Sequence, residues 1–312
     1  MINRKVAIIG CGFVGSATAF SLMQSGLFSE MVLLDVDQKK AEGEAMDISH
    51  GMPFSTPMKI YAGDYDDIVD SAIIIVTAGC NQKPDETRLD LVNKNVAIYK
   101  QIMGEIAKRK VEGILLIVSN PVDILTYVAW KFSGLAKHRV IGSGTVLDTA
   151  RLKCMLGEEL GVDARSVHAF IIGEHGDSEL AVFSSANVSG IDLRDFYDMC
   201  QPDEYHEDTA RIHEDVKDSA YRIIEGKKAT YYGVAMAVRR ICECIMRNEH
   251  SILTVSSVVD GQYGAYDMAL SLPCIVGNRG LEQTIQIDLN EDEQQRLENS
   301  IQVLGDVLAG CL

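Results

Sequence analysis

The stretch that decides the fold is Lys5-Val6-Ala7-Ile8-Ile9-Gly10-Cys11-Gly12-Phe13-Val14-Gly15, in which a short apolar run leads directly into the pattern G-x-G-x-x-G. Glycines with this spacing are typical of the turn between the first strand and the first helix of a dinucleotide-binding fold. Gly10 permits the tight turn, Gly12 lets a pyrophosphate approach the backbone, and Gly15 allows close packing of helix on strand. We therefore expect a dinucleotide at the N-terminus of this helix. The alternative is a glycine-rich turn that binds no nucleotide.

An acidic residue after the second apolar run supports the nucleotide interpretation. Asp35 directly follows Met31–Leu34 and comes 20 residues after Gly15. A carboxylate at this point accepts hydrogen bonds from the adenosine ribose hydroxyls and repels a 2′-phosphate. The pattern therefore predicts NAD, rather than NADP, as the cofactor.

The first half of the chain alternates short apolar runs with amphipathic stretches. The runs are Val6–Ile9, Met31–Leu34, Ala72–Val76, Ile114–Val118 and Val140–Ile141, and the stretches include Val14–Gln24, Val92–Lys108 and Pro121–Phe132. Continuous apolar runs are typical of strands buried on both faces of a parallel sheet. This alternation predicts an α/β fold, with a doubly wound parallel sheet of the Rossmann type in an N-terminal domain at residues 1–143.

The second half has a different pattern, which predicts an α+β substrate domain at residues 144–312. Expected strands are Val167–Ile172, Leu180–Val188, Ser251–Val259, Met268–Val276 and Thr284–Leu289, with a turn at Gly277–Gly280. Expected helices are Asp203–Glu225, Ala229–Met246 and Asp292–Leu308. Strands joined by short turns favour antiparallel pairing.

Charge and cysteine spacing exclude several classes of function. The 312 residues carry 45 Asp and Glu against 29 Lys and Arg, a net charge of −16, which disfavours nucleic acid and membrane surfaces as partners. The eight cysteines are scattered without a C-x-x-C pair, so we expect free thiols in a reducing cytoplasm and no metal site. The sequence also lacks a run of 18 apolar residues, which disfavours a membrane span.

Three polar segments carry residues suited to the reduction of a 2-keto acid. They are Gly79–Asp90, which follows a predicted strand, Gly144–Arg151, which opens a predicted helix, and Gly173–Ser178, a glycine-flanked turn. A substrate carboxylate needs an Arg clamp, and a ketone oxygen needs a proton donor such as a His beside a carboxylate. Taken singly, each residue has a structural alternative: a surface ion pair, a solvated loop cation or a structural histidine.

These segments together resemble the lactate/malate dehydrogenase family, and the likeness is closest to bacterial L-lactate dehydrogenases. It rests also on Gly10–Gly15, on Ser119-Asn120-Pro121-Val122-Asp123 and on Ala229-Thr230-Tyr231-Tyr232-Gly233, and it covers the chain in order. The resemblance implies that His175 is the acid–base residue oriented by Asp148, that Arg151 binds the substrate carboxylate and that Arg88 polarises the carbonyl. It also implies that Asn120 contacts the nicotinamide ribose or the substrate, and that Thr230 lines the pocket.

The resemblance further implies an NAD site, a substrate preference and an assembly. The implied cofactor contacts are Gly10, Gly12, Val14, Gly15, Asp35, Lys40, Tyr65, Gly79, Cys80 and Asn120. The family divides at the position of Gln82, where malate enzymes carry Arg, so a neutral amide favours pyruvate and L-lactate. Malate and branched-chain 2-hydroxy acids stay as alternative substrates, and a non-catalytic NAD-binding relative is the alternative from another class. Asp85 departs from the glycine usual in this loop, and the effect on loop closure stays open.

A homotetramer, or at least a dimer, is the assembly that the resemblance implies. Many bacterial relatives bind fructose 1,6-bisphosphate with an Arg and a His at a subunit interface, and the corresponding residues here are Lys153 and His168. Lysine keeps the charge but loses the bidentate fork of arginine, so activation by the sugar phosphate is an open expectation.

Overall fold

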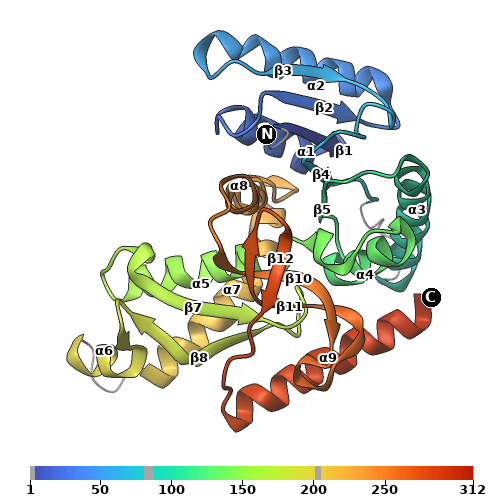
Figure 1. Ribbon diagram of the computed structural model, residues 1–312. Helices are drawn as coiled ribbons and strands as arrows, with labels where there is room; N and C mark the ends of the chain where they lie inside the picture. The colour runs from blue at the N-terminus through green and yellow to red at the C-terminus, as the bar shows by residue number, and fades with distance from the viewer. Residues whose placement is uncertain (1–3, 81–87, 201–204, 312) are drawn as a thin grey trace.

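The computed structural model describes residues 4–80, 88–200 and 205–311. In this part of the chain, a large sheet has the strand order β12-β11-β10-β6-β5-β4-β1-β2-β3, and a smaller sheet has the order β7-β8-β9 (Figure 1). The strands of the N-terminal half are β1 (Lys5–Ile9), β2 (Glu30–Leu34), β3 (Lys59–Ala62), β4 (Ile73–Val76), β5 (Ile114–Ile117) and β6 (Val140–Gly142). Those of the C-terminal half are β7 (Val167–Ile172), β8 (Leu180–Val188), β9 (Ile191–Asp192), β10 (Ser251–Asp260), β11 (Tyr266–Gly277) and β12 (Gly280–Thr284).

Strands β1 to β6 form the parallel half of the large sheet. Read from the edge inward, their order is 3-2-1-4-5-6, the order of a doubly wound dinucleotide-binding fold. β1, β4 and β5 are buried along their whole length, which explains why their sequences are continuous apolar runs. The order of strands reverses between β1 and β4, and ligands bind at such a reversal beyond the carboxyl ends of the strands.

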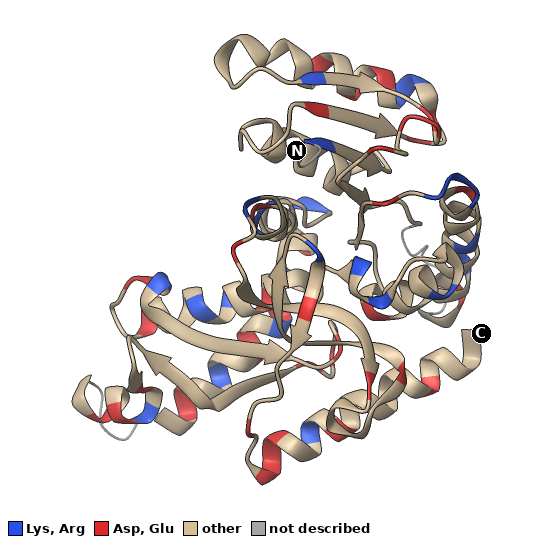
Figure 2. Ribbon diagram, viewed as in Figure 1, with Lys and Arg blue, Asp and Glu red and all other residues tan. Residues whose placement is uncertain are grey.

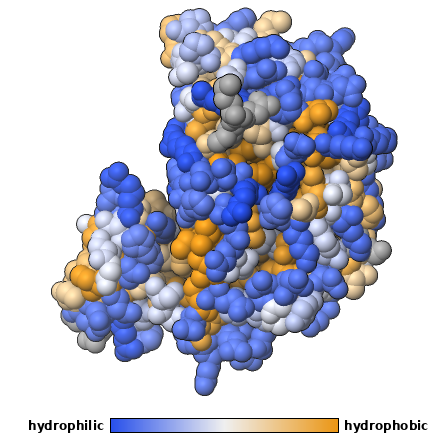
Figure 3. Space-filling model, in the orientation of Figure 1, coloured by the Kyte–Doolittle hydropathy of each residue, from blue (hydrophilic) through white to orange (hydrophobic). Residues whose placement is uncertain are grey.

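Helices pack against both sheets, and charged residues are spread over the helices of both halves, whereas the central strands are drawn mostly without them (Figure 2). The helices are α1 (Phe13–Met23), α2 (Gln38–His50), α3 (Arg88–Arg109), α4 (Val122–Ser133), α5 (Val146–Glu159), α6 (Leu193–Cys200), α7 (Tyr205–Lys227), α8 (Tyr232–Arg247) and α9 (Glu291–Cys311). No helix in the described ranges is long and apolar enough to cross a membrane. Polar residues cover much of the face drawn in Figure 3, with apolar residues gathered near its middle.

The large sheet continues from the N-terminal half into the C-terminal half. β6 pairs with β5 on one side, and on the other side it pairs antiparallel with β10, where Gly142 lies opposite Ser256. β10, β11 and β12 then extend the sheet in antiparallel order. The two predicted domains therefore share one sheet, and the boundary at residue 143 follows the strand that joins them.

Most expected elements are present, but one predicted strand is wrong. Thr284–Leu289 is not a strand: β12 ends at Thr284, and residues 285–290 have no strand assignment. The N–H of Ile285 donates to the carbonyl of Pro273 on β11, but proline has no N–H to donate in return, so the ladder stops. The sequence patterns also missed β3, α2 and α6; β3 is an edge strand that is only partly buried, so it lacks a clear apolar run.

Candidate active site

The glycine turn between β1 and α1 has the geometry that a dinucleotide pyrophosphate requires. Gly10 has a φ of +104°, and a Cβ on Gly15 would lie 1.9 Å from the carbonyl oxygen of Gly10, so neither position accepts a side chain without strain. A Cβ on Gly12 would meet nothing within 4 Å, which leaves open space beside the turn. No described side chain caps the N-terminus of α1. The turn therefore fits an anion that accepts hydrogen bonds from the first N–H groups of the helix.

Asp35 is held beside this turn at the end of β2. Its Oδ2 accepts a 2.7 Å hydrogen bond from the backbone N–H of Cys11, and its Oδ1 accepts one of 3.0 Å from the N–H of Asp37. The carboxylate is thus fixed next to the proposed phosphate site, as a ribose-binding role requires. Of the other predicted cofactor residues nearby, Lys40 is exposed on α2, Tyr65 is half-buried in the segment after β3 and Val14 is half-buried on α1.

Asn95 on α3 connects two further segments that carry predicted cofactor residues, and no sequence pattern indicated its role. Its Oδ1 accepts a 2.8 Å hydrogen bond from the N–H of Cys80, which with Gly79 follows β4. Its Nδ2 donates a 2.9 Å hydrogen bond to the carbonyl of Asn120, which follows β5. Asn95 is buried, so it fixes the two chain segments that leave neighbouring parallel strands.

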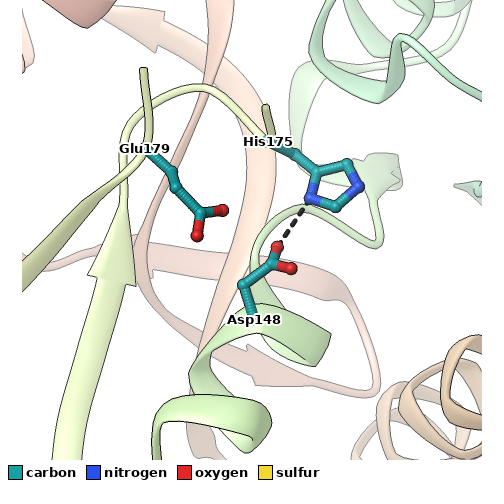
Figure 4. Close-up of side chains that lie close together, drawn as sticks. All are labelled: Asp148, His175 and Glu179. Carbon is teal, nitrogen blue, oxygen red and sulfur yellow. Dashed lines mark hydrogen bonds and ion pairs between the residues drawn. The ribbon is translucent and has the colours of Figure 1, made fainter. Parts of the chain in front are cut away.

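The structure brings His175, Asp148 and Arg151 together from two different elements. Asp148 and Arg151 lie on α5, and His175 lies in the turn between β7 and β8. His175 Nδ1 is 2.6 Å from Asp148 Oδ2, and Arg151 Nη1 donates a 2.8 Å hydrogen bond to Asp148 Oδ1. The Asp148 side chain is 3% exposed and that of His175 is 25% exposed. The ring therefore stays accessible, and its Nε2 points away from Asp148 (Figure 4).

The charges in this group favour a protonated histidine. Burial lowers the pKa of His175, but the charge and hydrogen bond of Asp148 outweigh burial and raise the pKa to about 9. Burial raises the pKa of Asp148, but the neighbouring His175 and Arg151 outweigh burial and hold the pKa of this carboxyl group below its usual value. The pair is therefore an imidazolium and a carboxylate at neutral pH, and Nε2 can donate a proton.

Asp123 anchors the backbone of His175, a role the sequence did not reveal. Asp123 lies in the first turn of α4, is 2% exposed, and its Oδ2 accepts a 2.8 Å hydrogen bond from the N–H of His175. Its Oδ1 accepts hydrogen bonds from the hydroxyls of Ser256, at 2.6 Å, and Ser271, at 2.9 Å. Because α4 follows Asn120, Asp123 ties the histidine turn to the carboxyl end of β5.

The remaining predicted site residues are placed only in part. Gln82 lies outside the described residues, and Arg88 begins α3 with a side chain that is likewise outside them. Thr230 is half-buried in the segment between α7 and α8. Lys153 is half-buried on α5, and burial lowers its pKa. His168 is exposed on β7.

Taken together, these features define a class of protein. A glycine turn that fits a pyrophosphate, a carboxylate held beside this turn and an accessible His–Asp pair next to an arginine are typical of a nicotinamide-dependent oxidoreductase. Residues 4–142 match the lactate/malate dehydrogenase NAD binding domain, and residues 145–310 match the lactate/malate dehydrogenase alpha/beta C-terminal domain. The chain therefore belongs to the lactate/malate dehydrogenase family, and residues 4–142 form its NAD-binding part.

Relatives of known name cover the whole chain. An L-lactate dehydrogenase from Acetivibrio thermocellus is 54% identical over 98% of this chain and 97% of its own length. A crystal structure of a minor L-lactate dehydrogenase from Enterococcus mundtii, in the ligands-bound form, has a TM-score of 0.96 and 42% identity over 99% of this chain and 98% of its own. A lactate dehydrogenase from a Medee basin deep-sea metagenome library has a TM-score of 0.97 and 45% identity over 100% of this chain and 99% of its own.

Proposed function

We propose that the protein is an NAD-dependent L-lactate dehydrogenase, which reduces pyruvate to L-lactate and runs in reverse when L-lactate is in excess. The observation that carries the proposal is the group formed by His175, Asp148 and Arg151, in a chain with relatives named L-lactate dehydrogenase along its full length. NADH supplies the hydride that reaches the carbonyl carbon. The residues of the chain bind the keto acid, orient it and supply the proton.

Arg151 and His175 have complementary roles in this proposal. The planar guanidinium of Arg151 forms paired hydrogen bonds with the substrate carboxylate, which fixes the position of the neighbouring carbonyl. His175 donates the proton from Nε2 to the carbonyl oxygen as the carbon is reduced. Asp148 accepts from Nδ1 throughout, so it sets the orientation of the ring and stabilises the protonated form. Asp123 holds the backbone of the histidine turn in place.

The side chains assigned from the sequence complete the proposed pocket. In this proposal Arg88 polarises the carbonyl oxygen, Thr230 lines the pocket, and Gln82 is the residue that decides between pyruvate and oxaloacetate. A neutral amide leaves the second carboxylate of oxaloacetate unpaired in a closed site, which costs about 2–5 kcal/mol. This argument favours lactate over malate, and it leaves branched-chain acids to be separated by experiment.

The experiment is a parallel assay of NADH oxidation with pyruvate, oxaloacetate and 2-ketoisocaproate. Pyruvate is expected to have the highest kcat/KM, by at least about tenfold, which corresponds to about 1.4 kcal/mol in transition-state binding. The reverse assay with L-lactate and D-lactate tests the stereochemistry, and only L-lactate is expected to react. A preference for either other keto acid would reassign the substrate. An absence of turnover with all three, in a chain that binds NADH, would favour the non-catalytic alternative.

Assembly, control and location complete the proposal. A cytoplasmic homotetramer is the form proposed from the family, and sedimentation at several protein concentrations measures the assembly. Lys153 and His168 are proposed to bind fructose 1,6-bisphosphate, because the lysine ammonium group and the imidazole N–H can donate hydrogen bonds to phosphate oxygens. A pyruvate saturation curve measured with and without the sugar phosphate tests this idea, and identical curves would contradict it.

A further inference from the structure

A third carboxyl group lies beside the His–Asp pair, and the proposed reaction gives it no role. Glu179 directly precedes β8, and one side-chain atom each of Glu179, His175 and Asp148 lie within 4.8 Å of one another (Figure 4). Glu179 is 5% exposed, and its Oε1 is buried with no hydrogen-bond partner in the described ranges. A buried polar atom without a partner costs free energy, so its position beside the acid–base residue calls for an explanation.

Three elements place charged or titratable groups around Glu179. From α5 these are Asp148 and Arg151, from the β7–β8 turn His175, and from α7 His213 and Lys217. Arg151 hydrogen-bonds to Asp148, and Lys217 forms an ion pair with Glu214. No described cation is paired directly with the Glu179 carboxyl group.

His213 does not compensate the charge of Glu179 either. The imidazole of His213 is hydrogen-bonded to the backbone of Glu179, and it is 4% exposed. Burial lowers the pKa of His213 to about 4, so the ring is uncharged at neutral pH. Glu179 thus lies near one carboxylate, one partly exposed imidazolium and a neutral imidazole, while the nearby cations Arg151 and Lys217 are paired with other carboxylates.

This environment keeps Glu179 protonated at neutral pH. Burial, followed by the negative charge of Asp148, raises the pKa of Glu179 to about 8. A neutral carboxyl group leaves the charges of His175 and Asp148 undisturbed. Above pH 8, however, the same group becomes an additional carboxylate close to His175, and a negative charge at this distance favours the imidazolium.

We propose that Glu179 is a positioning residue that acts through His175, and that its ionisation at alkaline pH keeps the proton on the imidazole. The inference rests on the proposed function for its kinetic consequence. Pyruvate reduction needs a protonated His175, and lactate oxidation needs a neutral one. Glu179 therefore extends pyruvate reduction to higher pH and shifts the onset of lactate oxidation to higher pH. Asp123 also faces His175, but its contacts with Ser256 and Ser271 are independent of Glu179.

The test is Glu179→Gln, which keeps the size of the side chain and removes its titration. Below pH 7 the variant should match the wild type in kcat/KM for pyruvate, because Glu179 is then uncharged in the wild type. At alkaline pH, kcat/KM for pyruvate should decline at a pH about one unit lower in the variant than in the wild type. The variant should therefore be about fivefold slower at pH 9. Lactate oxidation, which needs the neutral imidazole, should change in the opposite direction and become about twofold faster at pH 9. A merely structural defect would slow both directions at every pH.

Glu293→Gln is the matched control. Glu293 on α9 is a buried glutamate, 4% exposed, that accepts hydrogen bonds from the backbone and hydroxyl of Ser184. Its substitution removes a buried carboxylate away from His175 and should leave both pH profiles where they are. Thermal unfolding and NADH affinity of both variants separate loss of folding from a change in proton affinity.

A second readout does not depend on turnover. The His175 imidazole signal in an NMR titration, assigned with His175→Asn, should show a pKa about one unit lower in Glu179→Gln than in the wild type. Equal His175 pKa values, or superimposable alkaline profiles, would overturn the inference. A wild-type protein that reduces no pyruvate, but whose His175 pKa falls in Glu179→Gln, would contradict the proposed function and still support the coupling.

Discussion

The backbone N–H of His175 donates a 2.8 Å hydrogen bond to the carboxylate of Asp123, so the turn that carries His175 is fixed to the helix that follows β5. This bond connects the NAD-binding half of the chain with the C-terminal half. The carboxylate is buried and also accepts from two serine hydroxyls of β10 and β11. One side chain therefore joins three segments that meet at the site.

Substitution of Asp123 tests this connection. Asp123→Ala removes the acceptor of three hydrogen bonds and leaves the N–H of His175 and two buried serine hydroxyls without this partner, so it should lower the free energy of unfolding by about 2–4 kcal/mol. Asp123→Asn should recover much of this loss, because its amide oxygen can accept from His175 while the serine hydroxyls rotate to accept from its NH₂ group. Chemical denaturation at a fixed protein concentration measures both. Equal stability of the alanine variant and the wild type would contradict the anchoring role.

Replacement of the acid–base residue should separate chemistry from binding. His175→Asn removes the proton donor at Nε2 and keeps a polar side chain, so kcat should fall by about 10²–10⁴-fold. NADH affinity, measured by fluorescence titration, should stay nearly unchanged, because the cofactor contacts lie on other segments. Residual activity close to that of the wild type would require a different proton donor.

The His175–Asp148 pair predicts a specific pH dependence. Pyruvate reduction should decline as the pH rises through about 9, where His175 loses its proton. Because the folded pKa lies above the unfolded value of 6.5, the pair contributes stability that is fully present below pH 6.5 and is lost as the pH rises through about 9. In Asp148→Asn the activity should decline at lower pH, and the fall in unfolding free energy over this window should shrink. Unchanged profiles would exclude Asp148 as the cause.

Arg151 should matter through its shape as well as its charge. Arg151→Lys keeps the positive charge and loses the planar fork, so kcat/KM for pyruvate should fall by about 100-fold or more. Most of the change should appear in KM, since ground state and transition state share the carboxylate. Lys153→Arg, a conservative change on the same helix, serves as the comparison and should leave pyruvate KM without effector unchanged.

Gln82 should control the choice of acid. Gln82→Arg supplies a cation for the second carboxylate of oxaloacetate, so the ratio of kcat/KM for oxaloacetate over pyruvate should rise by at least about tenfold. The same paired assay on the wild type provides the reference. A ratio that does not move would remove the specificity argument and leave malate as an equal candidate.

Local sequence patterns predicted the cofactor half of the site, whereas the positions of the other site residues depend on packing between distant parts of the chain. The turn at Gly10–Gly15 and the position of Asp35 depend on a few neighbouring residues, so spacing alone revealed them. His175 and Asp148 are 27 residues apart on different elements, and only the family resemblance placed them together before the structure did. Asp123, Asn95 and Glu179 have no such signal, because their burial depends on how α3, α4, α7 and the two sheets meet. The wrong prediction of a strand at Thr284–Leu289 also reflects a long-range contact. The strand β12 ends at Thr284 because the next pairing position on β11 is Pro273, which has no N–H to donate.

The pairing of β6 with β10 has a consequence for attempts to divide the protein. A fragment that ends at residue 143 would leave the edge of β6 without its neighbour, and an open edge in the middle of an apolar sheet invites pairing with other chains. The cofactor half is thus expected to aggregate when expressed alone. We also expect the intact chain to melt in a single cooperative step, even though its two halves match separate domain profiles.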